Sequence, residues 1–420
     1  MPAQTLAQKL IARAAGRSHV AVGEIVTCQV DLAMFHDSSG PRRLKPMLQE
    51  LGAQIWDKSK VVLVMDHYVP EQDDDARKIV RIARDWARDQ ALPHVYDSMG
   101  ICHVVLPQKG HLRPGMLCVG GDSHSPTGGA FGTYMFGVGS TEMLGVVVTG
   151  EIWLRVPQTI QMHWRGNLAR GVTAKDMMLH TIGRFGMNGG QYQAVEFCGA
   201  AVQALSMPER MTLCNMSAEL GAQTGLVAPD AVTQDWLETV GVARQDISHW
   251  HTDADAQVER HSFDASTLPP QVAAPHSPAN THAVATHAGT PVHVAYIGAC
   301  TGAKLEDLRA AASVLRGHKV AQGVQLMVAP ASVQDQQQAK QEGVMQILQD
   351  AGAQLFATAC GACAGYGGSV PEGSTVISST ARNFKGRMGA ATAQVYLASP
   401  YTVAASALRG VITDPREVLV

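Results

Sequence analysis

Four short apolar runs in this sequence each end in polar or glycine-rich residues, and TVISST (375–380) is a fifth apolar run. Continuous apolar runs of about four to eight residues indicate strands that are buried on both faces of a parallel sheet. Polar residues at the ends of such strands are typical of doubly wound parallel sheets, in which ligands bind at the carboxyl ends of the strands. The four runs are KVVLVMDH (60–67), GMLCVGGDSH (115–124), VHVAYIGACTG (292–302) and LFATACGACAG (355–365).

Helical stretches alternate with these runs. DDDARKIVRIARDWARDQ (73–90) has apolar residues at helical spacing, and the acidic residues of its first turn complement the helix dipole. The N-terminal stretch 1–16 also has helical apolar spacing. With 41 glycines and only 5% aromatic residues, the chain has the composition of an α/β enzyme with many tight turns between strands and helices.

The length of 420 residues is enough for two or three domains. One boundary is expected near Pro157, after a run at 141–157 that we interpret as helical. The other is expected in 264–291, which is rich in Pro, Ala, Thr and His and which we interpret as an extended linker. The predicted fold class is α/β, with domains at 1–157, 158–285 and 286–420.

Charge and hydropathy argue against several functions. A formal net charge of −3 does not suggest a nucleic-acid partner, and no apolar run is long enough to span a bilayer. The N-terminus lacks the apolar block of a signal peptide, so we expect a cytoplasmic location. In that reducing compartment the eight cysteines are expected to be free thiols or ligands rather than disulfides.

The pair Cys360 and Cys363 allows several interpretations on its own. A C-x-x-C unit can be half of a zinc site, a redox disulfide or part of an iron–sulfur ligand set, and two structural cysteines fit the pattern equally well. The other polar residues at predicted strand ends are just as ambiguous one by one. His103 can be a hydrogen-bonded structural histidine, the Asp-Ser-His turn at 122–124 can be a cap, and Glu219 can cap a neighbouring backbone.

Taken together, these residues fit one kind of chemistry. In Asp66–His67 the carboxylate can fix the tautomer of the imidazole and raise its basicity, which suits acid–base catalysis. Arg382 and Arg387 can each bind a carboxylate through two hydrogen bonds. Cys300 and the C-x-x-C pair can hold a four-iron cluster whose fourth iron keeps an open position and acts as a Lewis acid. This inventory indicates the dehydration of a hydroxy-dicarboxylic acid.

Seven stretches, in order along nearly the whole chain, resemble the aconitase superfamily, and most of all its isopropylmalate dehydratase branch. So many ordered motifs make an accidental resemblance very unlikely. The stretches are GICHVVLPQ (100–108), GDSHSPTGGAFGTYMFGVGSTE (121–142), AVEFCG with LSMPERMTLCNMSAELGAQTGLVAPD (194–199 and 205–230), PQVAAPHSPAN (270–280), IGACTGAKLEDLR (297–309), CGACAG (360–365) and RNFKGRMG (382–389).

This resemblance implies three doubly wound α/β/α domains and a [4Fe-4S] cluster held by Cys300, Cys360 and Cys363. It also implies that Arg382 and Arg387 bind the carboxylates of the substrate. The partner of the C-x-x-C pair is therefore expected to be Cys300, sixty residues upstream.

The resemblance further implies a set of polar residues around the leaving hydroxyl and the open iron. Asp66 and His67 match the pair that handles the hydroxyl, and His103 is expected beside them. The other members of the set are Asp122, Ser123, His124, Asn215 and Glu219.

The sequence departs from the family pattern close to the cysteines. The usual S-C-T-N is A-C-T-G here, and C-G-P-C-L-G is C-G-A-C-A-G. The sulfur ligands are kept, but their polar surroundings are thinner, which is expected to shift substrate preference or weaken cluster retention. The departing positions are Gln108, Ala299, Gly302, Ala303, Lys304, Ala362, Ala364 and Ala381.

Full-length aconitases carry an additional mobile domain with a Ser-Arg motif that supplies the catalytic base, and these 420 residues contain no such segment. We therefore expect a separate small swivelling subunit, in a heterodimer or heterotetramer.

The implied activity is a hydro-lyase that interconverts 2- and 3-isopropylmalate. A homoaconitase, a citraconate (2-methylmalate) hydratase, a dimethylmalate dehydratase and a non-catalytic iron–sulfur regulatory protein are the alternatives. A zinc protein is a weaker one, because the C-x-x-C pair lacks a second close ligand pair.

Overall fold

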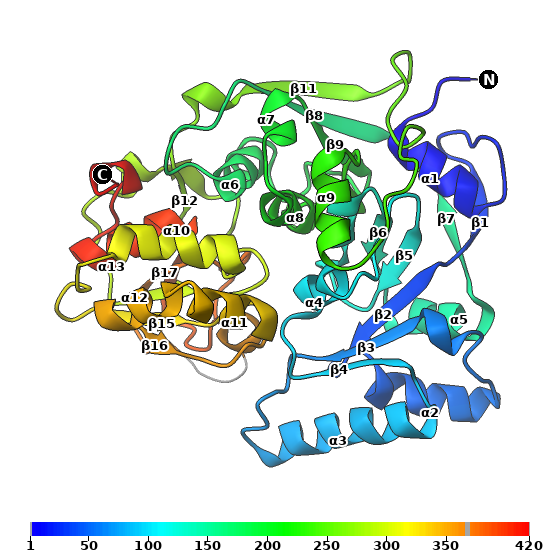
Figure 1. Ribbon diagram of the computed structural model, residues 1–420, viewed down its shortest axis with the longest axis horizontal. Helices are drawn as coiled ribbons and strands as arrows, with labels where there is room; N and C mark the ends of the chain where they lie inside the picture. The colour runs from blue at the N-terminus through cyan, green and yellow to red at the C-terminus, as the bar shows by residue number, and fades with distance from the viewer. Residues whose placement is uncertain (1, 366–369, 420) are drawn as a thin grey trace.

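The computed structural model describes residues 2–365 and 370–419. The first of its three large sheets has five strands: β2 (Leu32–His36), β3 (Val61–Met65), β4 (His94–Asp97), β5 (Leu117–Gly120) and β6 (Tyr134–Gly137). All five are parallel, in the order β4-β3-β2-β5-β6 (Figure 1). Met34 of β2 lies opposite Gly120 of β5, and His36 lies opposite Val64 of β3, so the carboxyl ends of these strands lie side by side.

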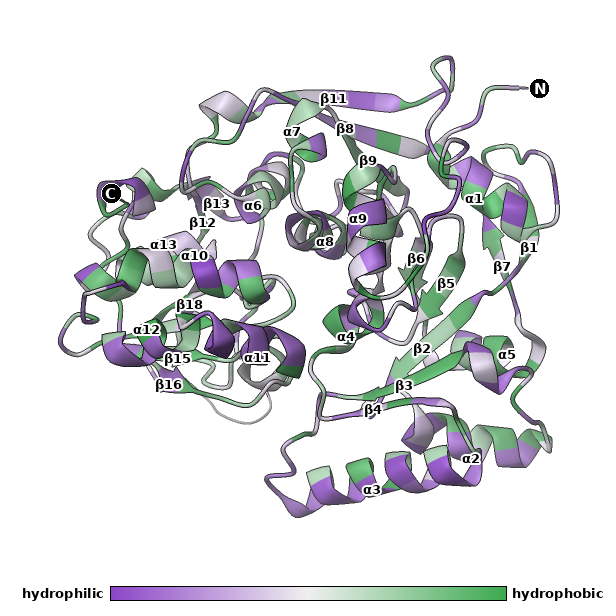
Figure 2. Ribbon diagram, in the orientation of Figure 1, coloured by the Kyte–Doolittle hydropathy of each residue, from purple (hydrophilic) through white to green (hydrophobic). Residues whose placement is uncertain are grey.

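Helices of the first domain cover this sheet. They are α1 (Leu6–Ala14), α2 (Pro41–Leu51), α3 (Asp74–Asp89), α4 (Cys102–Gln108) and α5 (Ser140–Thr149). The predicted helix at 73–90 is confirmed as α3, where the side chain of Asp73 accepts a hydrogen bond from the Ala76 N–H and caps the N-terminus. Its apolar face is buried and its charged face is turned to solvent (Figure 2).

The second large sheet is smaller and also parallel. Its strands are β8 (Thr159–Arg165), β9 (Ala194–Cys198), β10 (Thr224–Val227) and β11 (Glu259–Asp264). They follow the order β10-β9-β8-β11. The accompanying helices are α6 (Ala174–Phe185), α7 (Ala200–Gln203), α8 (Met207–Met216) and α9 (Ala231–Thr239).

The third large sheet has seven strands in the order β13-β12-β18-β17-β14-β15-β16. Its parallel part is made by β14 (Val294–Ile297), β15 (Gln325–Val328), β16 (Gln354–Leu355), β17 (Thr375–Ser378) and β18 (Gln394–Ala398). Antiparallel strands β12 (Gln271–Ala273) and β13 (Thr281–Ala283) extend one edge. The helices are α10 (Leu305–Leu315), α11 (Val333–Gln341), α12 (Val344–Ala351) and α13 (Pro400–Arg409).

The order of the strands creates a crevice in two of these sheets. In the first sheet the chain runs outward from β2 through β3 to β4 and then returns to the other side of β2 as β5. In the third sheet it runs outward from β14 to β16 and returns beside β14 as β17. Ligands of doubly wound sheets bind where the strand order reverses, so the ends of β2 and β5 and the ends of β14 and β17 are the expected sites.

One continuous apolar core connects the three sheets. It includes Met34 of β2, Ile160 of β8 and Ala295 of β14, which are all buried. Interiors of this kind are close-packed and transmit strain rather than yielding. The core therefore holds the two crevices in a fixed relation to each other.

Two interpretations of the sequence were wrong. The run at 141–157 is helical only in α5, because Glu151–Arg155 forms strand β7, which pairs with β1 (Ile25–Gln29) in a small antiparallel sheet. The stretch 264–291 is not simply a linker, because β12 and β13 lie within it and join the third sheet. The division of the chain at 157 and 285 stays a prediction.

Among the described residues, no helix combines the length and the apolar character that crossing a bilayer requires. The cytoplasmic location stays a prediction.

Candidate active site

Asp66 and His67 directly follow β3, and the structure places them at the carboxyl end of the first sheet. Oδ1 of Asp66 lies 2.7 Å from Nδ1 of His67, and Oδ2 accepts the Cys102 N–H at 2.7 Å. Asp66 is fully buried and His67 is buried to about nine-tenths. The carboxylate thus orients the ring and directs the other ring nitrogen of His67 away from the Asp66 contact.

His36 is the last residue of β2, and Asp37 follows it, beside this pair. Neither was predicted from the sequence as a site residue. The Asp37 carboxylate accepts the backbone N–H groups of His67 at 3.1 Å and Tyr68 at 2.8 Å. The ring of His36 stacks on the ring of His67 with centroids 3.9 Å apart. A signal was present, since the apolar run LAMF is followed by His-Asp just as VVLVM is followed by Asp-His.

Asp122 follows β5, on the other side of the strand-order reversal. Its Oδ1 lies 2.7 Å from Nε2 of His103, which is on α4, and accepts the His124 N–H at 2.7 Å. Its Oδ2 is 3.7 Å from Nε2 of His36. The Ser38 N–H donates to Nδ1 of His36, so a neutral His36 carries its proton on Nε2, facing Asp122. Asp122 therefore links the ends of β2 and β5.

Glu219 brings the second sheet into the same site. It follows α8, is almost completely buried, and its Oε1 lies 2.9 Å from Nε2 of His124. The same oxygen accepts the Nε–H of Arg382 at 2.6 Å, and another Arg382 N–H donates to Ser123 Oγ at 2.9 Å. These contacts join the turn after β5 and the turn after α8 to the loop after β17.

Burial and pairing move the pKa values of His67 and His103 in opposite directions. Burial opposes the charged form of His67, but the charge and hydrogen bond of Asp66 outweigh it and raise the pKa of His67 to about 9. Burial lowers the pKa of His103 although Asp122 opposes this. Burial also opposes ionisation of Asp122, yet His103 holds the pKa of that carboxyl well below its usual range. At neutral pH His67 is then an imidazolium and His103 a neutral imidazole, which are an acid and a base.

The three predicted ligand cysteines lie at the carboxyl ends of β14 and β16. The Asn215 amide donates to Cys300 Sγ at 3.2 Å, and the Cys360 N–H donates to the Asp66 carbonyl at 2.8 Å. The Cys360 thiol donates a hydrogen bond to the Cys363 sulfur, and this bond, with the Arg387 charge, lowers the pKa of Cys363 to about 6 against the effect of burial. The thiolate is the form of cysteine that binds metals.

Two buried oxygens beside this group have no partner among the described residues. They are Oδ1 of Asn215 and Oε2 of Glu219. Buried polar atoms are rarely left unpaired in folded proteins, so unpaired ones commonly mark a bound group or substrate. The three cysteine sulfurs, together with these two unpaired oxygens, fit an iron–sulfur cluster.

One departure near the cysteines, Gly302, has a local structural explanation. A Cβ at Gly302 would lie 2.3 Å from both Cβ and Oγ of Ser379, so this turn has no room for the asparagine of the family pattern. Ala299 adopts a positive φ of 70°, and Ala381 is buried. Gln108 donates to Asp335 Oδ1 at 3.1 Å. The side chain of Ala362 lies outside the described part of the chain.

A cavity of about 370 Å³ opens onto these residues. His36, His67, Asp122, Arg382 and Arg387 contribute to its wall. The buried Nε of Arg387 has no hydrogen-bond partner among the described residues, which leaves it free to bind a ligand. The described residues that line it come from the part of the chain that forms the first sheet and from the loops after β16 and β17.

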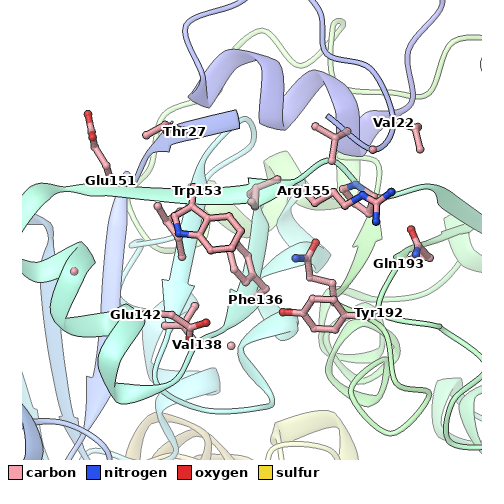
Figure 3. A pocket seen from close by; sticks show the side chains of 18 of the residues that line it. Val22, Thr27, Phe136, Val138, Glu142, Glu151, Trp153, Arg155, Tyr192 and Gln193 are labelled. Carbon is pink, nitrogen blue, oxygen red and sulfur yellow. The ribbon is translucent and has the colours of Figure 1, made fainter. Parts of the chain in front are cut away.

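A larger cavity of about 1020 Å³ lies elsewhere, beside β7 (Figure 3). Trp153, Arg155 and Tyr192 project into it, and Val138 lines both cavities. None of the described residues around the larger cavity is a predicted site residue. The chemistry of the side chains, rather than the size of the cavity, therefore identifies the site.

Hydrogen bonds connect most of the predicted site residues at the converging sheet ends, and Arg387 lies in the cavity wall beside them, although the roles of these residues stay predictions. The fold and the site define an acid–base enzyme whose cavity is lined by histidine, aspartate and arginine side chains. A family model described as aconitase family (aconitate hydratase) matches residues 8–410. The chain belongs to the aconitase family and is a hydro-lyase.

Two relatives with similar sequences agree with this assignment. A 3-isopropylmalate dehydratase large subunit 1 of Methanopyrus kandleri is 42% identical, over 99% of this chain and 100% of that protein. A probable methanogen homoaconitase large subunit of Methanothermobacter thermautotrophicus is 38% identical, over 99% of each chain. The holo form of aconitase X of Thermococcus kodakaraensis has 12% identity and a TM-score of 0.49, over 85% of this chain and 84% of that one.

Proposed function

We propose that this chain is the large subunit of a hydro-lyase that removes and re-adds water on a 2-hydroxy dicarboxylic acid of the 3-isopropylmalate type. The observation that carries the proposal is the single cavity that joins two carboxylate–imidazole pairs to Arg382 and Arg387. Relatives named 3-isopropylmalate dehydratase large subunit, at about 40% identity over the whole chain, support the choice of substrate class.

His67 is the acid for the leaving hydroxyl. Its pKa of about 9 keeps the imidazolium protonated at neutral pH, and Asp66 holds the ring in one orientation. His103 stays neutral and, with Asp122, orders the opposite side of the cavity. The site can therefore deliver a proton at one position without protonating every histidine around it.

Arg382 and Arg387 bind the carboxylates of the substrate. Glu219 and Ser123 hold Arg382 in place before substrate arrives, which limits the entropy lost on binding. Arg387 lines the cavity with its Nε unpaired among the described residues, so a carboxylate can complete its hydrogen bonding.

Cys300, Cys360 and Cys363 would hold a [4Fe-4S] cluster. When bound, such a cluster supplies a Lewis-acidic iron for a hydroxyl or carboxylate oxygen. The hydrogen bond from Cys360 lowers the pKa of Cys363 to about 6 and favours its thiolate, whereas burial raises the pKa of Cys300 to about 12 although the Asn215 hydrogen bond opposes this.

A separate small subunit completes the site. Removing a proton from carbon needs a base close to that hydrogen, and the histidines of this chain are committed to the hydroxyl side. The relatives named as large subunits support a two-chain enzyme.

Anaerobic reconstitution with iron and sulfide, followed by addition of a small subunit encoded beside this chain, tests the proposal. The expected result is formation of an unsaturated diacid from 2- or 3-isopropylmalate, detected by its ultraviolet absorbance. A complex with full iron and sulfide content that turns over no hydroxy diacid would refute it and favour a non-catalytic iron–sulfur role.

A homoaconitase is the second candidate, because a relative with that name is almost as similar as the dehydratases. The same assay distinguishes the two when homocitrate, 2-methylmalate and dimethylmalate are included. A higher kcat/KM for homocitrate than for isopropylmalate would select the homoaconitase.

A further inference from the structure

Lys175 on α6 is a buried cation with only neutral partners. The residue is 1% exposed. Its ammonium donates hydrogen bonds to Thr301 Oγ1 at 3.2 Å, the Ser379 carbonyl at 2.5 Å and the Thr380 carbonyl at 2.7 Å. These three bonds use its full donor capacity. Within the part of the chain that the structure describes, it forms no ion pair.

Two other buried lysines differ in this respect. Nζ of Lys9 lies 2.6 Å from Asp253, and Nζ of Lys304 lies 2.9 Å from Asp307. Burying an ion without a counter-ion is costly, so buried charges are normally paired. Burial lowers the pKa of Lys175 to about 8, and the charge of Asp307, which already pairs with Lys304, opposes this only in part. The burial of the Lys175 ammonium therefore leads us to expect an anion nearby.

The partners of Lys175 show where that anion would be. Thr301 directly follows Cys300, and Ser379 and Thr380 lead into the loop of Arg382. These two loops leave β14 and β17, where the strand order of the third sheet reverses, whereas Lys175 comes from a helix of the second sheet. One side chain therefore connects the predicted ligand loop, the predicted substrate loop and the neighbouring domain.

We propose that Lys175 is a positioning residue that fixes the Cys300 and Arg382 loops and balances the negative charge of the cluster's sulfur ligands. This inference rests on the proposed function, because it needs a bound cluster. It adds a residue from outside the cysteine motifs to the set that retains the cluster. Residues behind metal ligands commonly change metal affinity about ten- to a hundredfold.

The test compares Lys175→Met with Lys9→Met, a control that removes another buried lysine, one on α1 that is paired with Asp253 and, among the described residues, contacts none of the predicted ligand loops. Three quantities are measured: thermal unfolding of the cluster-free chains, the rate of iron loss to a chelator, and the cluster's reduction potential. We expect Lys175→Met to lose iron at least about tenfold faster than the parent chain and to shift the potential to more negative values. Lys9→Met should lower only the unfolding temperature. Lys175→Arg, which keeps the charge, should recover part of the potential.

Thr301→Val provides a second route if Lys175→Met does not fold, because it keeps the ammonium but removes one acceptor. Thr301→Val should increase the rate of iron loss less than Lys175→Met does. It should leave the reduction potential close to that of the parent chain. The inference would be overturned if the rate of iron loss and the reduction potential were unchanged in Thr301→Val and in the Lys175 variants that fold. That result would leave the proposed function intact. A parent chain that assembles no cluster would overturn both. A cluster-bearing parent without hydro-lyase activity would overturn only the proposed function.

Discussion

Single carboxylates determine the geometry of this site. Asp37 has no exposed surface and accepts N–H groups from the two residues that follow Asp66, so it fixes the turn after β3. Asp122 contacts His103 and the His124 backbone and faces His36. Each acidic side chain thus holds several neighbours in place, and this fixed arrangement is the condition for electrostatic catalysis.

The His67–Asp66 pair predicts a pH dependence of stability. The folded pKa of about 9 is above the ordinary value of 6.5, so the folded chain binds this proton more tightly than the unfolded chain. The stabilisation, about 3 kcal/mol, is fully present below pH 6.5 and is lost as the pH rises through 9. Asp66→Asn should flatten the free energy of unfolding across this window in urea titrations. Glu259→Gln, which removes the partner of the exposed His261, is the control and should leave the slope unchanged.

Arg387→Lys should weaken substrate binding much more than it weakens the fold. A guanidinium binds a carboxylate through two parallel hydrogen bonds, which an ammonium cannot reproduce, and the loss is about 1.5–3 kcal/mol, or roughly tenfold or more in affinity. The measurement is KM of the reconstituted two-subunit enzyme, with thermal unfolding in parallel. Arg309→Lys, at the surface pair with Glu342, is the control. A KM equal to that of the parent would argue against a carboxylate-binding role.

Cys360→Ser should prevent cluster assembly without unfolding the chain. Serine is nearly isosteric with cysteine but does not supply a thiolate, so the variant should retain little iron after anaerobic reconstitution. Iron and sulfide analysis checks this, with Cys198→Ser, a half-buried cysteine on β9, as the control. Full iron and sulfide content in Cys360→Ser would show that the ligand assignment is wrong.

At the scale of elements, the turn from β14 into α10 is packed directly against the end of β17. Ser379 Oγ accepts the Gly298 N–H at 2.9 Å and donates to the carbonyls of Gly298 and Gly302. The serine thereby takes the space that a side chain at Gly302 would need. The loss of the family's asparagine at 302 and the position of Ser379 are parts of one local arrangement.

This packing predicts a coupled pair of substitutions. Gly302→Ala should lower the free energy of unfolding by about 1–3 kcal/mol, because the new methyl group would overlap Ser379. Combining it with Ser379→Gly removes two of the three close contacts. The free energy of unfolding of the double variant should therefore fall by less than the sum of the decreases in the two single variants. Gly145→Ala on α5, where a Cβ meets nothing within 4 Å, is the control. Strict additivity in denaturant titrations would contradict this account.

At the scale of the molecule, the three sheets contribute to a network of polar side chains that none of them forms alone. His67 follows a strand of the first sheet, Glu219 belongs to the part of the chain that forms the second and Arg382 follows a strand of the third, and Glu219 contacts both His124 after β5 and Arg382 after β17. The common apolar core makes this arrangement rigid. Mobility needed for catalysis is then expected from a separate chain.

We expect the reconstituted chain alone to bind cluster and diacid but not to turn substrate over. Its histidines serve the hydroxyl side of the reaction, which leaves no base at the carbon that loses a proton. Steady-state assays with and without the small subunit measure this, and mass spectrometry excludes a co-purified partner. Robust turnover by the isolated chain would contradict the two-subunit proposal.

Local patterns in the sequence determined much of this protein. The apolar runs ending at Met65, Gly120 and Ile297 and the helix at 73–90 were predictable because burial and helical periodicity are read from neighbouring residues. The cysteines and arginines were identifiable because their chemistry is specific to the residue type. The resemblance to a family gave their expected roles.

Tertiary structure alone decided the rest. Strand β7 and the edge strands β12 and β13 form because distant strands offer hydrogen-bond partners, which a local pattern does not record. Lys175 resembles any helical lysine in the sequence, and only the packing of α6 against the third sheet buries it. The reason is physical: pKa values, unpaired polar atoms and cavities depend on atoms that are far apart in the chain and meet only when it folds.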